Sequence, residues 1–299
     1  MPHEIIEQVR VLLQQKSASP IDSIQIKSVG GGSINQAYKI IVNNDRHFFV
    51  KTNSSARFPK LFQKEKTGLL FLDKQNIIRV PDVIAHEENE TDQILILEWI
   101  DGGIKTEKFW KQFGEKLAAL HQQTWSDRDG QIMFGFNENN YMGALPQINS
   151  FTSNWIDFFI NCRLKPQIKS STENNLLQPA HIVSFEKLYR RLPDFFEKEK
   201  PSLLHGDLWS GNFMCDKTSH PVLIDPAIYF GHRSMDLGIT TLFGGFEKPF
   251  YESYNYNFTF PSNYKEQWDI CNLYPLLIHL NLFGQGYLNN IAGILKSYI

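Results

Sequence analysis

The stretch from Leu203 to Asp236, LLHGDLWSGNFMCDKTSHPVLIDPAIYFGHRSMD, constrains this chain more than any other. Within it, Asn212 follows Asp207 by five positions and Asp225 follows Asp207 by 18 positions. Phosphoryl-transfer sites use this order, because a loop Asp meets the acceptor hydroxyl while an Asn and a second Asp hold magnesium on the nucleotide phosphates. The spacing therefore predicts Asp207 as the catalytic residue, with Asn212 and Asp225 as magnesium ligands.

The residues between these side chains predict a hairpin. Residues 212–214 and 222–224 read as short strands joined by a turn, which would bring Asn212 and Asp225 to the same end. Asp236 follows Asp225 by only 11 positions. That is too short for the activation segment that binds a peptide substrate in protein kinases. We therefore expect a small-molecule acceptor.

A lysine and a glutamate in the first third of the chain predict the phosphate-binding ion pair of kinase-like folds. Lys51 lies in an apolar strand pattern, and Glu65 lies on the apolar face of a helix expected over residues 59–75. A carboxylate on a buried helix face needs a cationic partner, and Lys51 is the nearest upstream candidate. The alternatives are a glutamate facing water and a lysine at a sheet edge.

Two further segments are candidates for nucleotide binding. A glycine-rich turn between two strands can lay backbone N–H groups over phosphate, although a flexible hairpin turn is the alternative. Its residues are Gly30, Gly31, Gly32, Ser33 and Asn35. The second segment ends a buried strand, where backbone groups could meet the edge of adenine. It comprises Glu98, Trp99 and Ile100.

The order of predicted elements indicates an α+β fold with two lobes, of the bilobal protein-kinase-like type. Residues 1–100 are expected to form a nucleotide-binding lobe, with an N-terminal helix at 3–16, an antiparallel sheet and one main helix. Residues 101–299 are expected to form a mostly helical lobe that carries the catalytic loop and the substrate pocket. Its predicted helices include 106–124, 154–169, 237–246 and a helix at 264–283 interrupted by Pro275.

Side chains near the predicted catalytic loop are candidates for supporting or substrate-binding roles. Trp209 is expected to be exposed and to stack on a sugar ring, with a buried anchoring role as the alternative. Tyr141 lies in a loop rich in aromatic and amide groups, which could bind a sugar or pack on the core. His205 and Asp236 are expected to brace the loop by hydrogen bonds, and His121 reads as a core histidine.

Composition excludes several classes of partner. The net charge of −2 gives no reason to expect nucleic acid or an anionic membrane, and no apolar run reaches membrane-spanning length. The three cysteines are widely spaced and odd in number, which favours reduced thiols in a cytoplasmic protein. We expect a monomer.

Seven short motifs of this chain resemble those of the fructosamine-3-kinase (ketosamine-3-kinase) family, which is related to aminoglycoside and choline kinases. The resemblance runs from about residue 20 to 290. It is carried by LLHGDLWSGN from Leu203, IDPAIYFGH from Ile224, LFGGF from Leu242, GGGSIN from Gly30, FGF from Phe134, LPQ from Leu145 and NLFGQGY from Asn281.

The resemblance implies an ATP- and Mg²⁺-dependent kinase that phosphorylates the 3-hydroxyl of ketosamines. Such substrates are fructosamine, ribulosamine or erythrulosamine adducts of amines or protein lysines, and the unstable product leaves the amine, which is deglycation. Five residues match the family's functional positions, namely Lys51, Glu65, Asp207, Asn212 and Asp225. The alternatives are a phosphotransferase of the same fold acting on an aminoglycoside or choline, and a non-catalytic nucleotide-binding protein.

Two positions depart from the family pattern. Ser33 stands where relatives often carry a cysteine, so a thiol switch through the glycine-rich turn is not expected. Ser234 stands where relatives often carry an acid, and its role is open.

Overall fold

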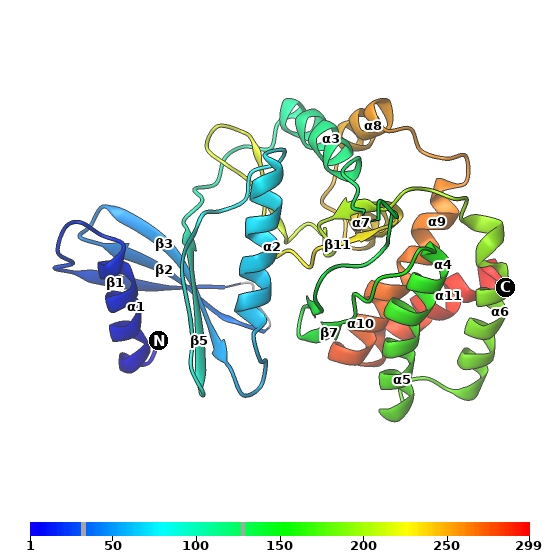
Figure 1. Cartoon of the computed structure of the whole chain (residues 1–299), viewed down its shortest axis with the longest axis horizontal. Coiled ribbons are helices and arrows are strands. Elements are labelled where there is room, and N and C mark those ends of the chain that lie inside the picture. The colour runs from blue at the N-terminus through cyan, green and yellow to red at the C-terminus, as the bar shows by residue number, and fades with distance from the viewer. Residues whose placement is uncertain (31–33, 127–128) are drawn as a thin grey trace. The chain divides into compact units, whose positions relative to one another are not determined.

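The computed structural model describes residues 1–30, 34–126 and 129–299. These residues divide into two compact units, one formed by Met1–Ile104 with Met214–Asp225 and the other by Lys105–Phe213 with Pro226–Ile299. The α+β class is confirmed, with an antiparallel sheet in the first unit and mainly helices in the second (Figure 1). No helix among the described residues is both long and apolar enough to cross a membrane.

The first unit is built on a five-stranded antiparallel sheet in the order β1-β2-β3-β5-β4. Its elements are α1 (His3–Gln15), β1 (Ile24–Val29), β2 (Gln36–Val42), β3 (Arg46–Ser54), α2 (Leu61–Gln75), β4 (Val83–Glu88) and β5 (Asp92–Glu98). Each predicted strand and helix of this part is present. The central position of β5, which is paired on both edges, explains its continuous apolar run Ile94–Leu97.

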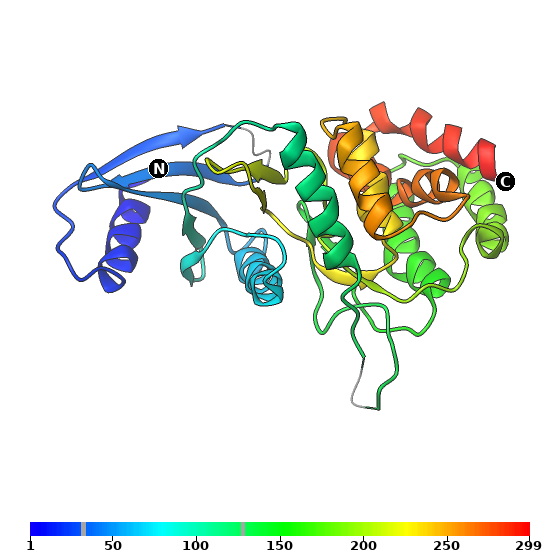
Figure 2. The same cartoon turned by 90° about the horizontal axis from the view of Figure 1, so that it is seen from above.

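The two helices of this unit lie on opposite sides of β5 (Figures 1 and 2). Helix α1 packs through Val9 and Leu13 on the sheet face that carries Ile40, Val50 and Ile96. Because side chains alternate along a strand, the residue after Val50 points to the other face, where α2 lies. The sheet therefore has a dry face under α1 and a face under α2 that can carry polar groups.

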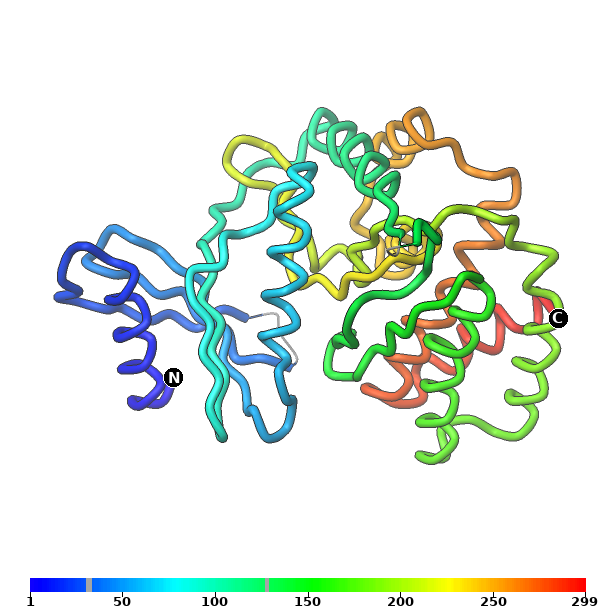
Figure 3. The backbone as a smooth tube through the Cα atoms, in the orientation of Figure 1, coloured from blue at the N-terminus to red at the C-terminus, as the bar shows by residue number. Residues whose placement is uncertain are grey.

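The hairpin of β9 (Phe213–Cys215) and β10 (Pro221–Leu223) is present as predicted, and Figure 3 shows it in yellow-green. The predicted lobe boundary at residue 100 assigned this hairpin to the second lobe, whereas its contacts place Met214–Asp225 in the first unit. The Gly103 amide donates to the Cys215 carbonyl at 2.7 Å, and the Leu223 amide donates to the Arg79 carbonyl at 2.9 Å. Backbone hydrogen bonds between distant segments caused this difference, and they leave no local sequence signal.

The second unit consists of helices around two short strand pairs, β6 with β7 and β8 with β11, and turns. It contains α3 (Glu107–His121), β6 (Asn140–Met142), β7 (Leu145–Gln147), α4 (Trp155–Phe158), the π-helical segment η1 (Phe159–Leu164), α5 (Lys165–Glu173), α6 (Pro179–Phe195), β8 (Ser202–Leu204), β11 (Tyr229–Gly231), α7 (Ser234–Leu242), α8 (Lys248–Asn257), α9 (Tyr264–Cys271), α10 (Leu273–Phe283), η2 (Gln285–Tyr287) and α11 (Leu288–Tyr298). Helices α3 and α8 lie side by side in both views (Figures 1 and 2).

Two predicted helices of this unit are subdivided. The helix expected at 154–169 contains the π-helical segment η1, which separates α4 from α5. The helix expected at 264–283 breaks at Asn272 rather than at Pro275. Pro275 lies in the first turn of α10, where a missing N–H costs no helical hydrogen bond, so the proline begins a helix instead of interrupting one.

Candidate active site

The first unit places Lys51 between two carboxylates. Lys51 lies in β3 and is 3% exposed. Its Nζ atom donates to Glu65 Oε1 at 2.7 Å and to Asp225 Oδ1 at 2.5 Å. The predicted ion pair with Glu65 is therefore confirmed, and the alternative of an edge lysine is wrong because β3 is paired on both sides.

One buried cation shared by two carboxylates determines the electrostatics of this cluster. Burial acts to lower the pKa of Lys51, but the charges of Asp225 and Glu65 outweigh it and raise that pKa overall. Burial raises the pKa of Glu65 to about 7, an effect that Lys51 opposes and Asp225 reinforces. The ammonium group is therefore held charged, while Glu65 is the carboxylate that takes up a proton most easily near neutral pH.

Asp225 is presented by a turn with unusual backbone geometry. Its φ angle is 55°, in the left-handed region that most side chains avoid, directly after the returning strand of the hairpin. The hairpin is anchored by Arg79, whose guanidinium donates to Asp216 at 2.8 Å and also pairs with Glu98. Strained backbone at a polar residue is common at functional sites.

The second unit brings Asp207 and Asn212 together. The Asn212 side-chain amide donates to the Asp207 carbonyl at 2.8 Å and to Asp207 Oδ2 at 3.0 Å. The Asn212 backbone amide donates to the Trp209 carbonyl at 3.0 Å, which closes the loop. The amide orientation leaves Asn212 Oδ1 as an oxygen donor for a metal. The convergence of Asp225 with this pair remains a prediction.

Asp236 braces the loop that carries Asp207, as predicted. Its two carboxylate oxygens accept hydrogen bonds from the backbone amides of His205 and Gly206, at 2.7 Å and 2.8 Å. His121 contacts the same carboxylate through Nε2 at 3.2 Å, so this core histidine has a polar partner. The Asp207 amide donates to the His205 ring at 3.3 Å, which confirms the bracing role of His205.

Gly206 permits a close backbone approach that no other residue would allow. Its φ angle is 87°, and a Cβ atom there would lie 2.0 Å from the Ala227 carbonyl oxygen. The Ala227 amide donates to the His205 carbonyl at 2.8 Å. The loop before Asp207 and the segment after Pro226 are thus locked against each other.

Trp209 is half-buried, not freely exposed as expected. Its ring packs edge-to-face with Phe243 at a centroid distance of 6.0 Å, and it covers Gly211, where a Cβ atom would lie 2.3 Å from the indole. Phe243 in turn lies 4.9 Å from the ring of His279, which contacts Tyr287 at 5.1 Å. Sequence reasoning missed Phe243 and His279 as neighbours of the loop, although Phe243 lies within the LFGGF motif and His279 lies two positions before NLFGQGY.

The predicted nucleotide-binding residues differ in their availability. Gly31, Gly32 and Ser33 lie outside the described residues. Gly30 is exposed, and Asn35 Oδ1 accepts a hydrogen bond from Asn53 at 2.6 Å.

At the end of β5, the Glu98 amide donates to the Asp82 carbonyl at 2.9 Å, and the Glu98 carboxylate pairs with Arg79. That amide is therefore not available to adenine. The Trp99 ring lies 6.3 Å from Phe49 and under the Lys39 ammonium at 4.2 Å, and Ile100 is buried.

Two remaining sequence predictions have simple structural settings. Tyr141 is half-buried in β6, between the buried residues Asn140 and Met142. Ser234, one of the two departures from the family pattern, is buried at the start of α7 and donates to Gln267 Oε1 at 3.0 Å. It therefore has a structural partner within the second unit.

The donor set suits magnesium bound mainly through a nucleotide. Carboxylate and amide oxygens are the ligands that magnesium prefers, and Asn212 and Asp225 supply one of each. Among the described residues, no group of three or more His, Cys, Asp or Glu side chains is arranged to hold a metal. Magnesium commonly binds through one or two protein oxygens together with substrate phosphates, so the oxygen that each residue offers fits this ion. That the two residues bind one ion together is a prediction.

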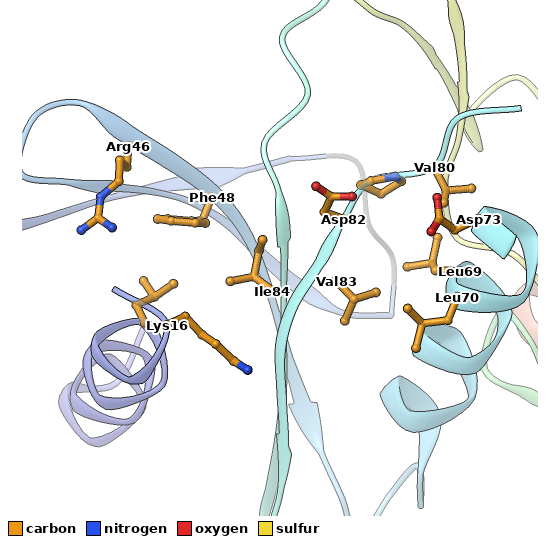
Figure 4. Close-up of a pocket in the computed structure, with 12 residues that line it drawn as sticks. Lys16, Arg46, Phe48, Leu69, Leu70, Asp73, Val80, Asp82, Val83 and Ile84 are labelled. Atoms are coloured by element: carbon orange, nitrogen blue, oxygen red, sulfur yellow. The ribbon is translucent and has the colours of Figure 1, made fainter. Parts of the chain in front are cut away.

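A separate cavity of about 520 Å³ lies in the first unit between α1, β4 and α2 (Figure 4). Its lining includes Phe48, Leu69 and Ile84, with Lys16 and Asp82 at its rim. Lys51, Glu65 and Asp225 do not line it, so it is distinct from the ion-pair cluster.

Comparison with solved structures defines the class of this protein. A crystal structure described as "Putative fructosamine-3-kinase" from Haemophilus somnus matches with a TM-score of 0.86 and 25% identity, covering 97% of this chain and 96% of that one. A macrolide 2'-phosphotransferase of type I matches with a TM-score of 0.59 and 12% identity, covering 100% of this chain and 98% of that one, and shows the fold alone. The class is that of the kinase-like phosphotransferases.

Sequence comparison identifies the family. The profile described as Fructosamine kinase matches residues 5–299, and the chain belongs to this family. The relative named "Probable ketoamine kinase" from Synechocystis sp. is 37% identical over 287 residues, covering 95% of this chain and 94% of the relative. The chloroplastic protein-ribulosamine 3-kinase of Arabidopsis thaliana is 36% identical over 283 residues, covering 92% and 82%. The chain is therefore an enzyme that transfers phosphate to an alcohol group, and its family implies ATP as the donor.

Proposed function

We propose that this enzyme transfers the γ-phosphoryl group of ATP to the 3-hydroxyl of a ketosamine. The supporting observation is the pair formed by Asp207 and Asn212 on a loop whose backbone is held by Asp236. Asp207 would accept the proton of the substrate hydroxyl. The hydroxyl oxygen would bond to the γ-phosphorus while the bond between that phosphorus and the ADP oxygen breaks. The phosphorylated adduct would then release the amine, which is deglycation.

The remaining site residues have proposed roles that follow from their chemistry. Lys51 would bind ATP phosphates and Glu65 would hold its ammonium in place. The turn at Gly30, Gly31, Gly32 and Ser33, together with Asn35, would cover the phosphates. The backbone at Trp99 and Ile100 would meet the adenine edge.

Magnesium and the sugar would bind to other members of the predicted set. Asn212 and Asp225 would hold magnesium, which supplies positive charge to the phosphates when bound. Trp209 would offer its ring face to the sugar, and Tyr141 would contact the same substrate. Fructosamine, ribulosamine and erythrulosamine adducts, free or on protein lysines, are the proposed acceptors.

A substrate panel tests this proposal directly. The purified enzyme, ATP and magnesium would be incubated separately with ribulosamines, fructosamines, erythrulosamines, an aminoglycoside and choline, and phosphorylated products would be measured by mass spectrometry. We expect ketosamine 3-phosphates. Turnover of the aminoglycoside or choline alone would establish the alternative of the same fold, and ATP binding without any turnover would indicate a nucleotide-binding protein.

A further inference from the structure

Arg163 is a buried cation in the second unit, and its described hydrogen bonds go to the carbonyls of Ile148 and Cys162 and to Asn149 Oδ1 rather than to a carboxylate. It lies on the π-helical segment η1 and is 0% exposed. Its guanidinium stacks over the rings of Tyr229 at 3.9 Å and Phe158 at 4.6 Å. Burying an unpaired guanidinium is costly, and π-helical segments are frequent at functional sites. The position therefore calls for an explanation beyond packing.

The guanidinium determines the orientation of a buried side-chain amide. Arg163 carries only donors, and one of its amino groups donates to Asn149 Oδ1 at 2.8 Å. The Asn149 amide nitrogen must then face the next acceptor, Asn140 Oδ1, at 3.0 Å. Asn140 in turn directs its own nitrogen to the Ile228 carbonyl at 2.9 Å. The guanidinium, which can only donate, thus fixes the orientation of the side-chain amides of both Asn149 and Asn140.

The other end of this chain is also a donor. The Tyr274 hydroxyl donates to Gln147 Oε1 at 3.0 Å, and burial raises the pKa of Tyr274 to about 12, which keeps the hydroxyl protonated. The Gln147 nitrogen is therefore turned to Asn140 Oδ1 at 2.8 Å and to the Ala227 carbonyl at 3.0 Å. Gln147 is 1% exposed, so water cannot replace these bonds.

This network contacts the two segments that the acceptor is proposed to meet, namely the loop that carries Asp207 and the hairpin that carries Tyr141. Ala227, which receives the Gln147 bond, donates its amide to His205 and lies against Gly206, next to Asp207. At the same time Asn140 and Gln147 pair across the β6/β7 hairpin that carries Tyr141. The network therefore joins the catalytic loop to the hairpin.

We propose that the side-chain network of Arg163, Asn149, Asn140, Gln147 and Tyr274 sets the distance between the acceptor hydroxyl and Asp207, with Gln147 as the central positioning residue. This inference rests on the proposed function, since it assigns Asp207 and the acceptor their roles. It does not involve the contacts of Lys51, Glu65 or Asp225, because these residues belong to the first unit, whereas all five side chains and Asp207 belong to the second.

The test compares two variants with a matched control. Gln147→Leu removes the donor, and Gln147→Glu replaces it by a carboxylate that repels the Ala227 carbonyl unless protonated. Gln167→Leu is the control, because Gln167 is also buried, at 5% exposure, and its side chain bonds only Asn281 among described contacts. Steady-state kinetics with a ribulosamine, melting temperature and the pH profile would be measured for each.

We expect Gln147→Leu to lower kcat roughly 10- to 100-fold, with KM for ATP unchanged, because small displacements of reacting groups cost this much. For Gln147→Glu, the kcat ratio to wild type should rise as the pH falls, since the protonated acid regains a donor. The ionisable groups around the network are Tyr274, Arg163, Asp207, Cys162 and Tyr229. The control should keep the wild-type kcat. Unchanged kcat in Gln147→Leu, or a Gln147→Glu profile parallel to wild type, would overturn the inference.

Failure of the proposed function can be distinguished from failure of this inference about the network. If the wild type phosphorylates no ketosamine, the proposed function fails, and the network is then tested by hydrogen exchange at the Ala227 amide, which bonds His205. Faster exchange in Gln147→Leu but not in Gln167→Leu would support the network as the support of the catalytic loop. Equal exchange in both variants would reject it.

Discussion

Lys51 shows how a single residue acquires its function from its neighbours. A lysine in the middle of a sheet is costly to bury, and here two carboxylates compensate that cost. Burial raises the pKa of Glu65 to about 7, and the neighbouring charge of Asp225 reinforces this effect. When both carboxylates are ionised, the cluster holds one negative charge more than Lys51 can neutralise.

The pH dependence of stability tests this charge imbalance. The folded pKa of Glu65 is above its ordinary value of 4.5, so the native state binds the extra proton between pH 4.5 and about 7. Stability from this group is fully present below pH 4.5 and is lost as the pH rises through 7. We expect the wild type to lose on the order of 2 kcal/mol relative to Glu65→Gln between pH 5 and 8. Urea unfolding at each pH measures this difference, and parallel curves would contradict it.

Asp207 is the residue whose removal should separate chemistry from nucleotide binding. Asp207→Asn keeps the shape of the side chain but removes the proton acceptor, so kcat should fall by about 10² to 10⁴. The dissociation constant for ATP should stay close to that of the wild type, because the proposed role of Asp207 is on the acceptor hydroxyl. Calorimetric titration with ATP and single-turnover kinetics provide the two measurements. A comparable loss of ATP affinity would assign Asp207 a different role.

At the scale of elements, the pairing of α3 with α8 depends on one missing side chain. A Cβ atom on Gly114 of α3 would lie 2.1 Å from the Phe250 carbonyl oxygen of α8, so the two helices approach through backbone atoms. Helix α8 also supplies Tyr254, whose hydroxyl contacts His121, the partner of Asp236. The distance between α3 and α8 therefore affects the position of His121, which contacts the Asp236 carboxylate that holds the loop before Asp207.

A pair of glycine substitutions isolates this contact. Gly114→Ala should destabilise the protein by about 2 kcal/mol or more, because the helices must move apart. Gly293→Ala in α11 has no atom within 4 Å of the added carbon and should stabilise by about 0.5 to 1 kcal/mol. Thermal unfolding of both variants makes the comparison. Equal effects would show that helix propensity, not the close approach, dominates at Gly114.

At the scale of the whole molecule, the two compact units have separate cores. The first unit encloses its sheet between α1 and α2, and α1 contributes Ile5, Val9 and Leu13 to the core. The second unit has its own helical core and the buried network around Arg163. Damage to the α1 core should therefore loosen the sheet that carries Lys51 before it affects the second unit.

Two substitutions on α1 test this separation. Leu13→Ala removes a side chain that is 3% exposed and should cost about 2 to 4 kcal/mol, whereas Val11→Ala, at 55% exposure, should change stability by less than about 0.5 kcal/mol. Hydrogen exchange should accelerate in β2, β3 and β5 of Leu13→Ala, with α10 unaffected. Uniform acceleration across both units would argue for a single cooperative core.

Local patterns were sufficient for much of the fold and for part of the site. Alternating apolar residues predicted the strands of the first unit, and helical spacing on α2 predicted the partner of Lys51. The motif around Asp207 predicted that Asp207 and Asn212 serve one site, and the structure adds the hydrogen bonds between them. The subdivision of the helix at 154–169 was not predictable, because the π-helical segment places Arg163 among partners that include the distant residues Tyr229 and Tyr274.

The amino-acid sequence by itself determined the class of chemistry, because short motifs keep the spacing that a phosphoryl-transfer loop requires. It also determined the lysine and glutamate pair, since burial of one charge demands the other. Only the tertiary structure decided that Trp209 is half-buried and that the β9/β10 hairpin belongs to the first unit. It also decided that Gln147 bonds both Asn140 and the Ala227 carbonyl. Those features depend on hydrogen bonds and packing between distant segments, which form only after the chain has folded and which no local pattern encodes.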